Sequence, residues 1–140
     1  MPRSRTNAGH EDDSVYMPRN EREFSRTKGF DDAVDEFRIN KLGVLTKVTK
    51  FEGEWKASTT DADISPAFKL KPLNGERGQY RVWQIYAGPD YRAAAMILMR
   101  RVEAYWIHTW KKTKQNNRGE VAKATSRAHR LWEQLKSDED

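Results

Sequence analysis

A segment in the C-terminal third of the chain combines the side chains that phosphate chemistry needs. Between Trp106 and Val121 it holds two tryptophans, one histidine and four basic residues, and a pair of asparagines marks the start of a predicted helix. Lysine and arginine keep their charge and can stabilise the anion that forms when a ribose 2′-hydroxyl attacks its own phosphodiester. Histidine can transfer the proton, and aromatic rings can stack on an unpaired base. These residue types are compatible with RNA binding and with RNA cleavage that needs no metal, but composition alone specifies such a site only weakly.

The charge distribution supports a polyanionic partner. The 140-residue chain has a net charge of +5. Ten Lys/Arg and only two acidic residues lie between Arg92 and Trp132, so this segment carries +8 and the remainder −3. Such asymmetry is typical of nucleic-acid binding. The alternative is a solvated surface whose charge only maintains solubility, and under that reading the lysine pair after Trp110 is solubilising.

The composition excludes several classes of protein. Cysteine is absent and the three histidines are scattered, so we expect no disulfide framework, no metal site and no cofactor. No apolar run approaches the roughly 20 residues of a membrane span, and the N-terminus lacks the apolar stretch of a signal peptide. We therefore expect a cytoplasmic protein.

The chain predicts one domain with short extensions. Residues 1–28 mix charges, Pro, Gly and Asn without a period, which predicts a mobile arm. Residues 29–136 form the predicted domain, and 137–140 an acidic tail. Apolar residues from Val34 to Phe51 follow a helical period interrupted near Gly43, which favours a helix pair beginning at Asp31 or Asp32.

Strand signals and an ambiguous stretch follow. The residues Tyr80–Tyr86 are typical of a strand. The run from Ala93 to Met99 is continuously apolar, which fits a helix or a strand buried on both faces equally well. If the next segment is a strand, alternation places Trp106, His108 and Trp110 on one face, and we then expect His108 to be a core residue.

The last segment predicts a helix. Asn117 and Glu120 have the spacing of a capping box, in which each side chain meets a free backbone N–H. Apolar residues then recur at spacings of three and four and predict a core-facing stripe, formed by Val121, Ala124, Ala128, Leu131 and Leu135.

Four motifs carry a resemblance to a known family. They are "LKPLNGERGQYRVWQI", the "YR" pair Tyr91-Arg92, "WKKTKQ" from Trp110 to Gln115, and "EVAKATSRAHR" from Glu120 to Arg130. In this order, over about residues 66–132, the chain resembles the RelE/HigB superfamily of toxin–antitoxin toxins, and most closely its HigB-like, phage-derived branch.

The resemblance implies both a fold and a function. The implied fold is α+β, with N-terminal helices, an antiparallel curved β-sheet that includes Tyr91–Met99 and Ala104–Trp110, and a C-terminal helix packed on the sheet. The implied function is that of a toxin that inhibits translation by ribosome-dependent, metal-independent mRNA cleavage. The implied partners are a cognate antitoxin, expected to be a helix-turn-helix protein, and the ribosome with its mRNA.

The motif match also assigns candidate residues. The candidate catalytic residues are Arg92 as phosphate binder and Lys111 with Lys112 as charge stabilisers; the candidate RNA-binding residues are Arg81, Lys114 and Arg118. Two alternatives stay open. One is a toxin that inhibits DNA gyrase, as in the related ParE branch, and the other is a non-catalytic nucleic-acid-binding protein of phage origin, for which the basic segment suffices.

Overall fold

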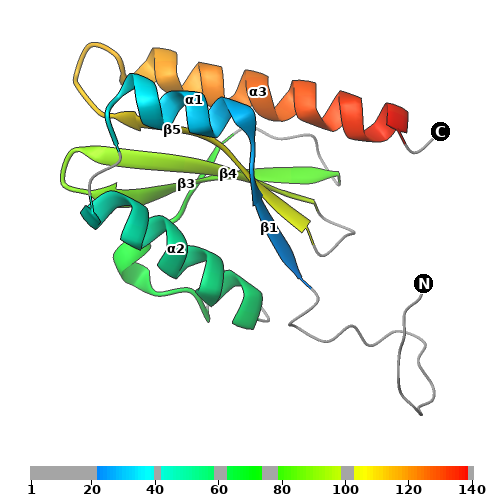
Figure 1. Ribbon diagram of the computed structural model, residues 1–140, viewed down its shortest axis with the longest axis horizontal. Helices are drawn as coiled ribbons and strands as arrows, with labels where there is room; N and C mark the ends of the chain where they lie inside the picture. The colour runs from blue at the N-terminus through cyan, green and yellow to red at the C-terminus, as the bar shows by residue number, and fades with distance from the viewer. Residues whose placement is uncertain (1–21, 40–41, 59–62, 74–78, 99–102, 139–140) are drawn as a thin grey trace.

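The computed structural model describes residues 22–39, 42–58, 63–73, 79–98 and 103–138. Its elements are β1 (Glu23–Arg26), α1 (Lys28–Glu36), α2 (Leu42–Ala57), the short 3₁₀ helix η3 (Pro66–Phe68), β2 (Lys71–Leu73), β3 (Tyr80–Gly88), β4 (Tyr91–Leu98), β5 (Glu103–Lys111) and α3 (Asn117–Asp138). The strands form one five-stranded sheet in the order β1-β5-β4-β3-β2. Figure 1 shows α1 and α3 along one side of this sheet and α2 on the other. The expected α+β class is confirmed.

The two faces of the sheet have separate cores. On the face covered by α2, here the α2 face, Ile85, Ala93 and Trp106 pack with residues of α2 and η3. On the opposite face, the α3 face, the sheet packs against Ala124 and Ala128 of α3 through a second set, which includes Val82, Ala94, Met96, Ile107 and Trp110. Every side chain of the sheet can therefore be assigned to a face by its place in the register.

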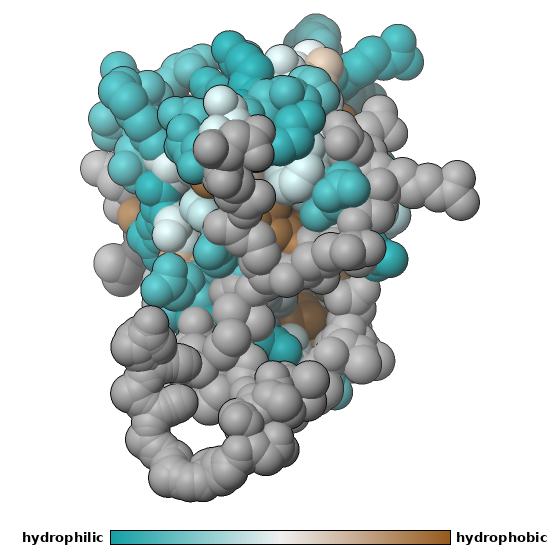
Figure 2. All heavy atoms as spheres, turned by 90° about the vertical axis from the view of Figure 1, so that its right-hand side faces the viewer, coloured by the Kyte–Doolittle hydropathy of each residue, from teal (hydrophilic) through white to brown (hydrophobic). Residues whose placement is uncertain are grey.

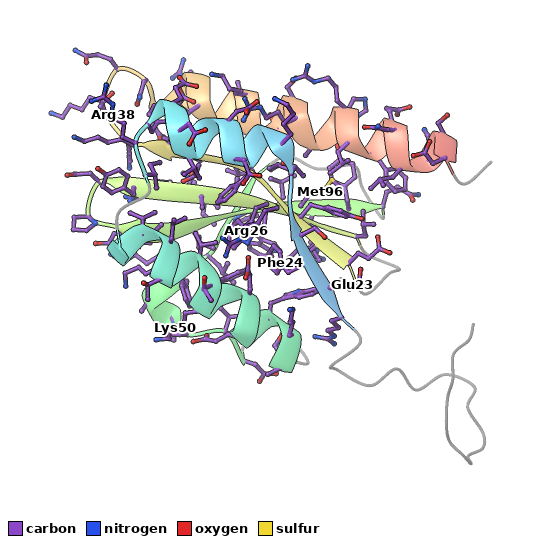
Figure 3. All side chains as sticks on the ribbon, in the orientation of Figure 1. Glu23, Phe24, Arg26, Arg38, Lys50 and Met96 are labelled. Atoms are coloured by element: carbon purple, nitrogen blue, oxygen red, sulfur yellow. The ribbon has the colours of Figure 1, made fainter. Side chains whose placement is uncertain are left out.

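The N-terminal boundary of the domain differs from the prediction. Residues 23–28 were placed in the mobile arm, but Glu23–Arg26 form β1, which pairs in parallel with β5. Phe24 stacks on Trp106 at a centroid distance of 4.8 Å and makes edge contacts with Phe51 and Trp55 of α2. Figure 3 shows Phe24 directed between the sheet and α2. A four-residue strand is too short for a period, so one aromatic was its only signal. Residues 1–21 lie outside the described part of the chain.

The predicted helix pair is confirmed, but its boundaries are not. α1 begins after Thr27, whose hydroxyl accepts a hydrogen bond from the backbone N–H of Phe30 at 3.2 Å, so Asp31 and Asp32 are not the cap. α1 ends before Arg38, which has φ 55°. Gly43 lies within α2, so the break precedes the glycine that predicted it.

The ambiguous apolar stretch forms strands. Residues Tyr91 to Ile97 of β4 pair antiparallel with Ala104 to Lys111 of β5, as the resemblance implied. The four residues Ala93 to Met96 are buried, because both faces of this central strand are covered. Met99, the predicted end of the run, lies outside the described residues. Burial on both faces explains why the sequence could not distinguish this strand from a helix.

A β-bulge in β5 changes which residues share a face. Ala94 pairs with His108, and the next residue, Ala95, pairs with Trp106, so Ile107 is inserted. A bulge interrupts the alternation of side chains along a strand. As a result Trp106 packs on the α2 face and Trp110 on the α3 face. The expectation that Trp106, His108 and Trp110 share one face is therefore wrong for Trp106.

Helix α3 presents the predicted apolar stripe to the sheet. Ala124 and Ala128 are fully buried, and the longer members Val121, Leu131 and Leu135 are half-buried. The upper part of the face in Figure 2, at the height of α1 and α3 in Figure 1, is mostly hydrophilic. No helix in the described ranges is long and apolar enough to cross a membrane.

The start and the end of α3 differ from the prediction. Asn117 Oδ1 accepts a hydrogen bond from Trp110 Nε1, and Glu120 Oε1 lies 2.6 Å from His108 Nε2, so the two predicted capping side chains bind β5 instead. The predicted tail is also corrected, because residues 137 and 138 still belong to α3. Residues 139–140 lie outside the described part.

Candidate nucleic-acid interface

Most of the predicted site residues gather at one end of the sheet. Arg92 lies at the start of β4 opposite Trp110, and Lys111 ends β5 opposite Tyr91. The backbone N–H of Lys112 donates to the carbonyl of Asp90 in the β3–β4 turn. The predicted RNA-binding residues Lys114 and Arg118 follow in the connection to α3 and in its first turn, and both are exposed.

Arg81 does not belong to this group. It pairs with Ile97 near the opposite end of β3, whereas Arg92 pairs with Tyr86. Five residues of extended chain separate Arg81 from Tyr86, which corresponds to roughly 17 Å. Arg81 could therefore contact only a different part of a bound RNA.

The register separates Lys111 from Arg92. Arg92 pairs with Trp110, which packs on the α3 face. Lys111 pairs with Tyr91, which packs against Ile39, Val44 and Ala87 beside α2. Paired residues of neighbouring strands point to the same face, and successive residues point to opposite faces. Lys111 and Arg92 consequently face opposite sides of the sheet, and the catalytic roles expected of Arg92, Lys111 and Lys112 stay predictions.

A different set of residues surrounds Arg92 on the α3 face. Its Cζ atom lies 5.0 Å from the centroid of the Tyr86 ring, and Lys69 Nζ lies 4.8 Å from the same centroid. Lys71 of β2 pairs with Gln84, which lies two residues before Tyr86 in β3 and on the same face. Lys69 and Lys71 are exposed, and Tyr86 and Arg92 are half-buried. We name Lys69, Lys71, Tyr86 and Arg92 the Tyr86 patch.

Gln84 lies under this patch with an unused acceptor. The residue is 7% exposed, and its Oε1 is buried without a hydrogen-bond partner in the described structure. A buried polar atom without a partner costs about 1–3 kcal/mol. A donor group or a water molecule reaching this oxygen would recover that energy.

Sequence reasoning missed Lys69, Lys71 and Tyr86. Two signals were available, because Lys69 and Lys71 alternate, as do Gln84 and Tyr86. Alternation along a strand places Gln84 and Tyr86 on one face. Lys69 precedes β2 with φ 48°, so the strand period does not fix its position. The sequence did not show that both pairs and Arg92 share a face, because this depends on the register of β2, β3 and β4.

His108 is a core residue, as expected, and belongs to a buried polar network. Its side chain is fully buried, with Nε2 at 2.6 Å from Glu120 Oε1 and Nδ1 at 2.8 Å from Arg127 Nη1. Arg127 Nη1 also donates to the carbonyls of Gly29 and Ile107. The network therefore joins α1, β5 and α3.

The protonation state of His108 follows from these contacts. Because Arg127 can only donate, Nδ1 is the acceptor and Nε2–H donates to Glu120, which describes a neutral imidazole. Burial is the main cause that lowers the pKa of His108 below 6.5, with a further lowering by the charge of Arg127, against the opposing effect of Glu120. With both ring nitrogens engaged and no exposure, His108 cannot transfer a proton to a bound RNA in this arrangement.

The lowered pKa of His108 predicts a pH-dependent stability. The unfolded state binds a proton at His108 more tightly than the folded state does. The stabilisation of the fold by neutral His108 is therefore complete above pH 6.5 and is lost as the pH falls below 6.5 towards the folded-state pKa. Urea unfolding at pH 7.5, 6.5 and 5.5 should show this loss in wild type and a weaker one in His108→Gln. The exposed His129 offers a control. If His129→Gln weakens the pH dependence of stability as much as His108→Gln does, the effect does not come from the buried His108.

Metal ligation has no support in the described ranges, where no group of three or more His, Cys, Asp or Glu could hold a metal ion.

Comparison with solved structures identifies the fold. A chain of the archaeal RelE-RelB complex from Pyrococcus horikoshii OT3 superposes with a TM-score of 0.52 at 12% identity, over 66% of this chain and 97% of that one. A mutant YafQ from E. coli gives 0.47 at 15% identity, over 66% and 94%. A metal-bound toxin from Helicobacter pylori gives 0.46 at 18% identity, over 67% and 98%. No family model and no curated protein matches the sequence.

The class of fold follows from the first of these matches. The chain has a RelE-like fold, in agreement with the resemblance carried by its sequence motifs. Its place in the HigB-like branch stays a prediction.

Proposed function

We propose that this protein is the toxin of a toxin–antitoxin pair and inhibits translation in the cytoplasm by cleaving mRNA on the ribosome without a metal. The observation that carries the proposal is the Tyr86 patch, which places the charges of Lys69 and Arg92 against one ring on a RelE-like fold. Solved relatives of this fold include a RelE-RelB complex and toxins. A cognate antitoxin, expected to be a helix-turn-helix protein, is the proposed protein partner.

The proposed chemistry uses charge stabilisation. A 2′-hydroxyl loses its proton to water and attacks the adjacent phosphorus, the bond from phosphorus to the 5′ oxygen breaks, and that oxygen takes a proton from water, which leaves a 2′,3′-cyclic phosphate. The attack adds negative charge to the non-bridging oxygens, and fixed cations near those oxygens lower the barrier. Arg92 is the proposed phosphate ligand, because a guanidinium can hold two phosphate oxygens at once. Lys69 and Lys71 supply further positive charge on the same face.

The remaining basic residues extend the proposed RNA path. Lys112, Lys114 and Arg118 are exposed at the end of the sheet that carries Arg92 and continue into the first turn of α3. Contacts of this kind neutralise backbone phosphates and make binding dependent on salt. We propose that they hold the strand on either side of the cleaved bond.

Purified protein is expected to cut mRNA when ribosomes are present and to leave the same mRNA intact without them. Mapping of 5′ ends after a brief pulse of expression should show new ends within coding regions, together with a block of translation. Cleavage of free RNA would contradict ribosome dependence. Accumulation of relaxed DNA in gyrase reactions, with intact mRNA, would favour a gyrase inhibitor, and binding of RNA with neither activity would favour a non-catalytic protein.

A further inference from the structure

We infer that Arg38 is a further contact to the RNA backbone, held at one end of the sheet in a backbone conformation that favours glycine. The inference rests on the proposed function and deepens it, since it adds to the RNA path a residue that no sequence motif indicated. The observation behind it is the φ angle of Arg38, which is 55° at an exposed residue with a long charged side chain.

Arg38 occupies the position after a helix end at which glycine is usual. The backbone N–H of Ile39 donates to the carbonyl of Val34 at 2.8 Å, and the N–H of Arg38 donates to the carbonyl of Asp35 at 3.2 Å. These two hydrogen bonds define a Schellman motif, in which the residue after the C-cap is left-handed. A residue with a Cβ atom is disfavoured in this conformation, whereas glycine adopts it freely. Arginine at this position therefore costs stability.

The same conflict occurs at Lys69. Within the described residues, Arg38 and Lys69 are the two residues other than glycine with a positive φ, and both are exposed cations. Asparagine and aspartate are the side chains that usually tolerate this region, because they can hydrogen-bond locally. Neither position carries one, so local backbone stability does not explain why both are basic. Residues held in disfavoured conformations cluster at functional sites.

The neighbours of Arg38 place it at the end of the sheet that carries the proposed RNA path. Phe37 packs edge-on against His108 on the α3 face, with the ring centroids 6.3 Å apart. Ile39 is fully buried and packs in the same cluster as Tyr91, at the start of β4. Arg38 therefore lies where the chain crosses from α1 on one side of the sheet towards α2 on the other (Figure 1). Figure 3 shows it on the same side of the molecule as the β5–α3 connection.

The guanidinium of Arg38 is available to a ligand. In the described part of the chain its side chain makes no hydrogen bond and no ion pair, although Asp35 and Glu36 lie in the last turn of α1. A guanidinium can hold two phosphate oxygens at once. Because the residues on both sides are packed, less backbone freedom is lost when a phosphate binds here than on an unrestrained loop. Arg38 would carry the RNA path round the end of the sheet towards Lys111 on the α2 face.

A purely structural role for Arg38 makes the opposite prediction for stability. A cation at a helix C-terminus interacts favourably with the helix dipole, and Arg38 also follows the acidic residues Asp35 and Glu36. If these interactions explained the arginine, Arg38→Gly would lower the urea midpoint of unfolding. If the charge is kept for RNA at a cost in stability, Arg38→Gly raises the midpoint, because the strain of the left-handed conformation is removed.

The binding measurement uses a short single-stranded RNA with 2′-O-methyl riboses, which cannot be cleaved by its own hydroxyl. Arg38→Gly should weaken binding about three- to tenfold at low salt. It should also reduce the slope of log K against log salt concentration by about 0.7, the value for one phosphate contact to a single strand. Arg38→Lys keeps both the charge and the strain, so it should keep the wild-type slope and the wild-type urea midpoint.

Lys28→Gln is the matched control, because it removes one positive charge at the other end of α1. We expect it to keep the wild-type slope. The inference would be overturned by equal losses in Arg38→Gly and Lys28→Gln, by wild-type binding or a lowered urea midpoint in Arg38→Gly, or by a reduced slope in Arg38→Lys. These outcomes leave the proposed function in place if the wild type cleaves mRNA. A wild type that neither binds RNA nor cleaves mRNA would remove the proposed function and the inference together.

Discussion

Replacing Arg92 by alanine is expected to lower the rate of ribosome-dependent mRNA cleavage by about 10²–10³-fold, the usual cost of removing one group that stabilises an anionic transition state. Arg92 is the cation of the Tyr86 patch whose place is set by a strand, by backbone carbonyls and by the ring of Tyr86. Cleavage rates measured with saturating ribosomes would separate this effect from a loss of binding.

Lys111→Ala is the matched control for this variant. It also removes one positive charge at the same end of the sheet, but the register places Lys111 on the face opposite to Arg92. We expect only a few-fold change, typical of a phosphate contact away from the reacting centre. Equal losses in the two variants would contradict the assignment of the site to the α3 face. An Arg92→Ala protein with full activity would remove Arg92 from the mechanism.

Replacing Arg127 by methionine is expected to destabilise the fold by about 2–4 kcal/mol, because it leaves buried acceptors without their donor. One nitrogen of Arg127 serves His108 Nδ1 and the carbonyl of Ile107 in β5, and the carbonyl of Gly29 in α1. Methionine retains the helix propensity and much of the volume of the side chain. Urea unfolding at pH 7.5 would measure the difference.

Arg130→Met provides the comparison on the same helix. Arg130 is exposed, three residues after Arg127, and we expect a change within about 0.5 kcal/mol. If both variants lose the same stability, the effect is one of net charge and not of the buried network. An Arg127→Met protein as stable as wild type would mean that α3 is held by apolar packing alone.

Several features of this protein could be read from local sequence. The stripe from Val121 to Leu135 predicted α3, and the period around Val34 and Phe51 predicted a helix pair. The concentration of basic residues after Arg92 pointed to a polyanionic partner. Each of these signals lies within a short segment. Helical period, strand propensity and charge can be recognised there without knowing which helix or strand packs against the segment.

Other features were decided by contacts between distant segments. The helical propensity of Ala93 to Met96 gave way to burial on both faces of β4. The bulge at Ile107 moved Trp106 to the α2 face, away from His108 and Trp110. The short strand β1 became visible only through the packing of Phe24 on α2 and β5.

The candidate site shows the same division. The sequence by itself determined which candidate site residues carry charge, and it placed most of these candidates at or just after the segment that forms β5. The tertiary structure decided which of them share a surface, joining Lys69 and Arg92 at Tyr86 and separating both from Lys111. The physical reason is that side chains alternate along a strand, so a shift of one residue in register moves a residue to the other face. That register is set by pairing between strands far apart in the chain.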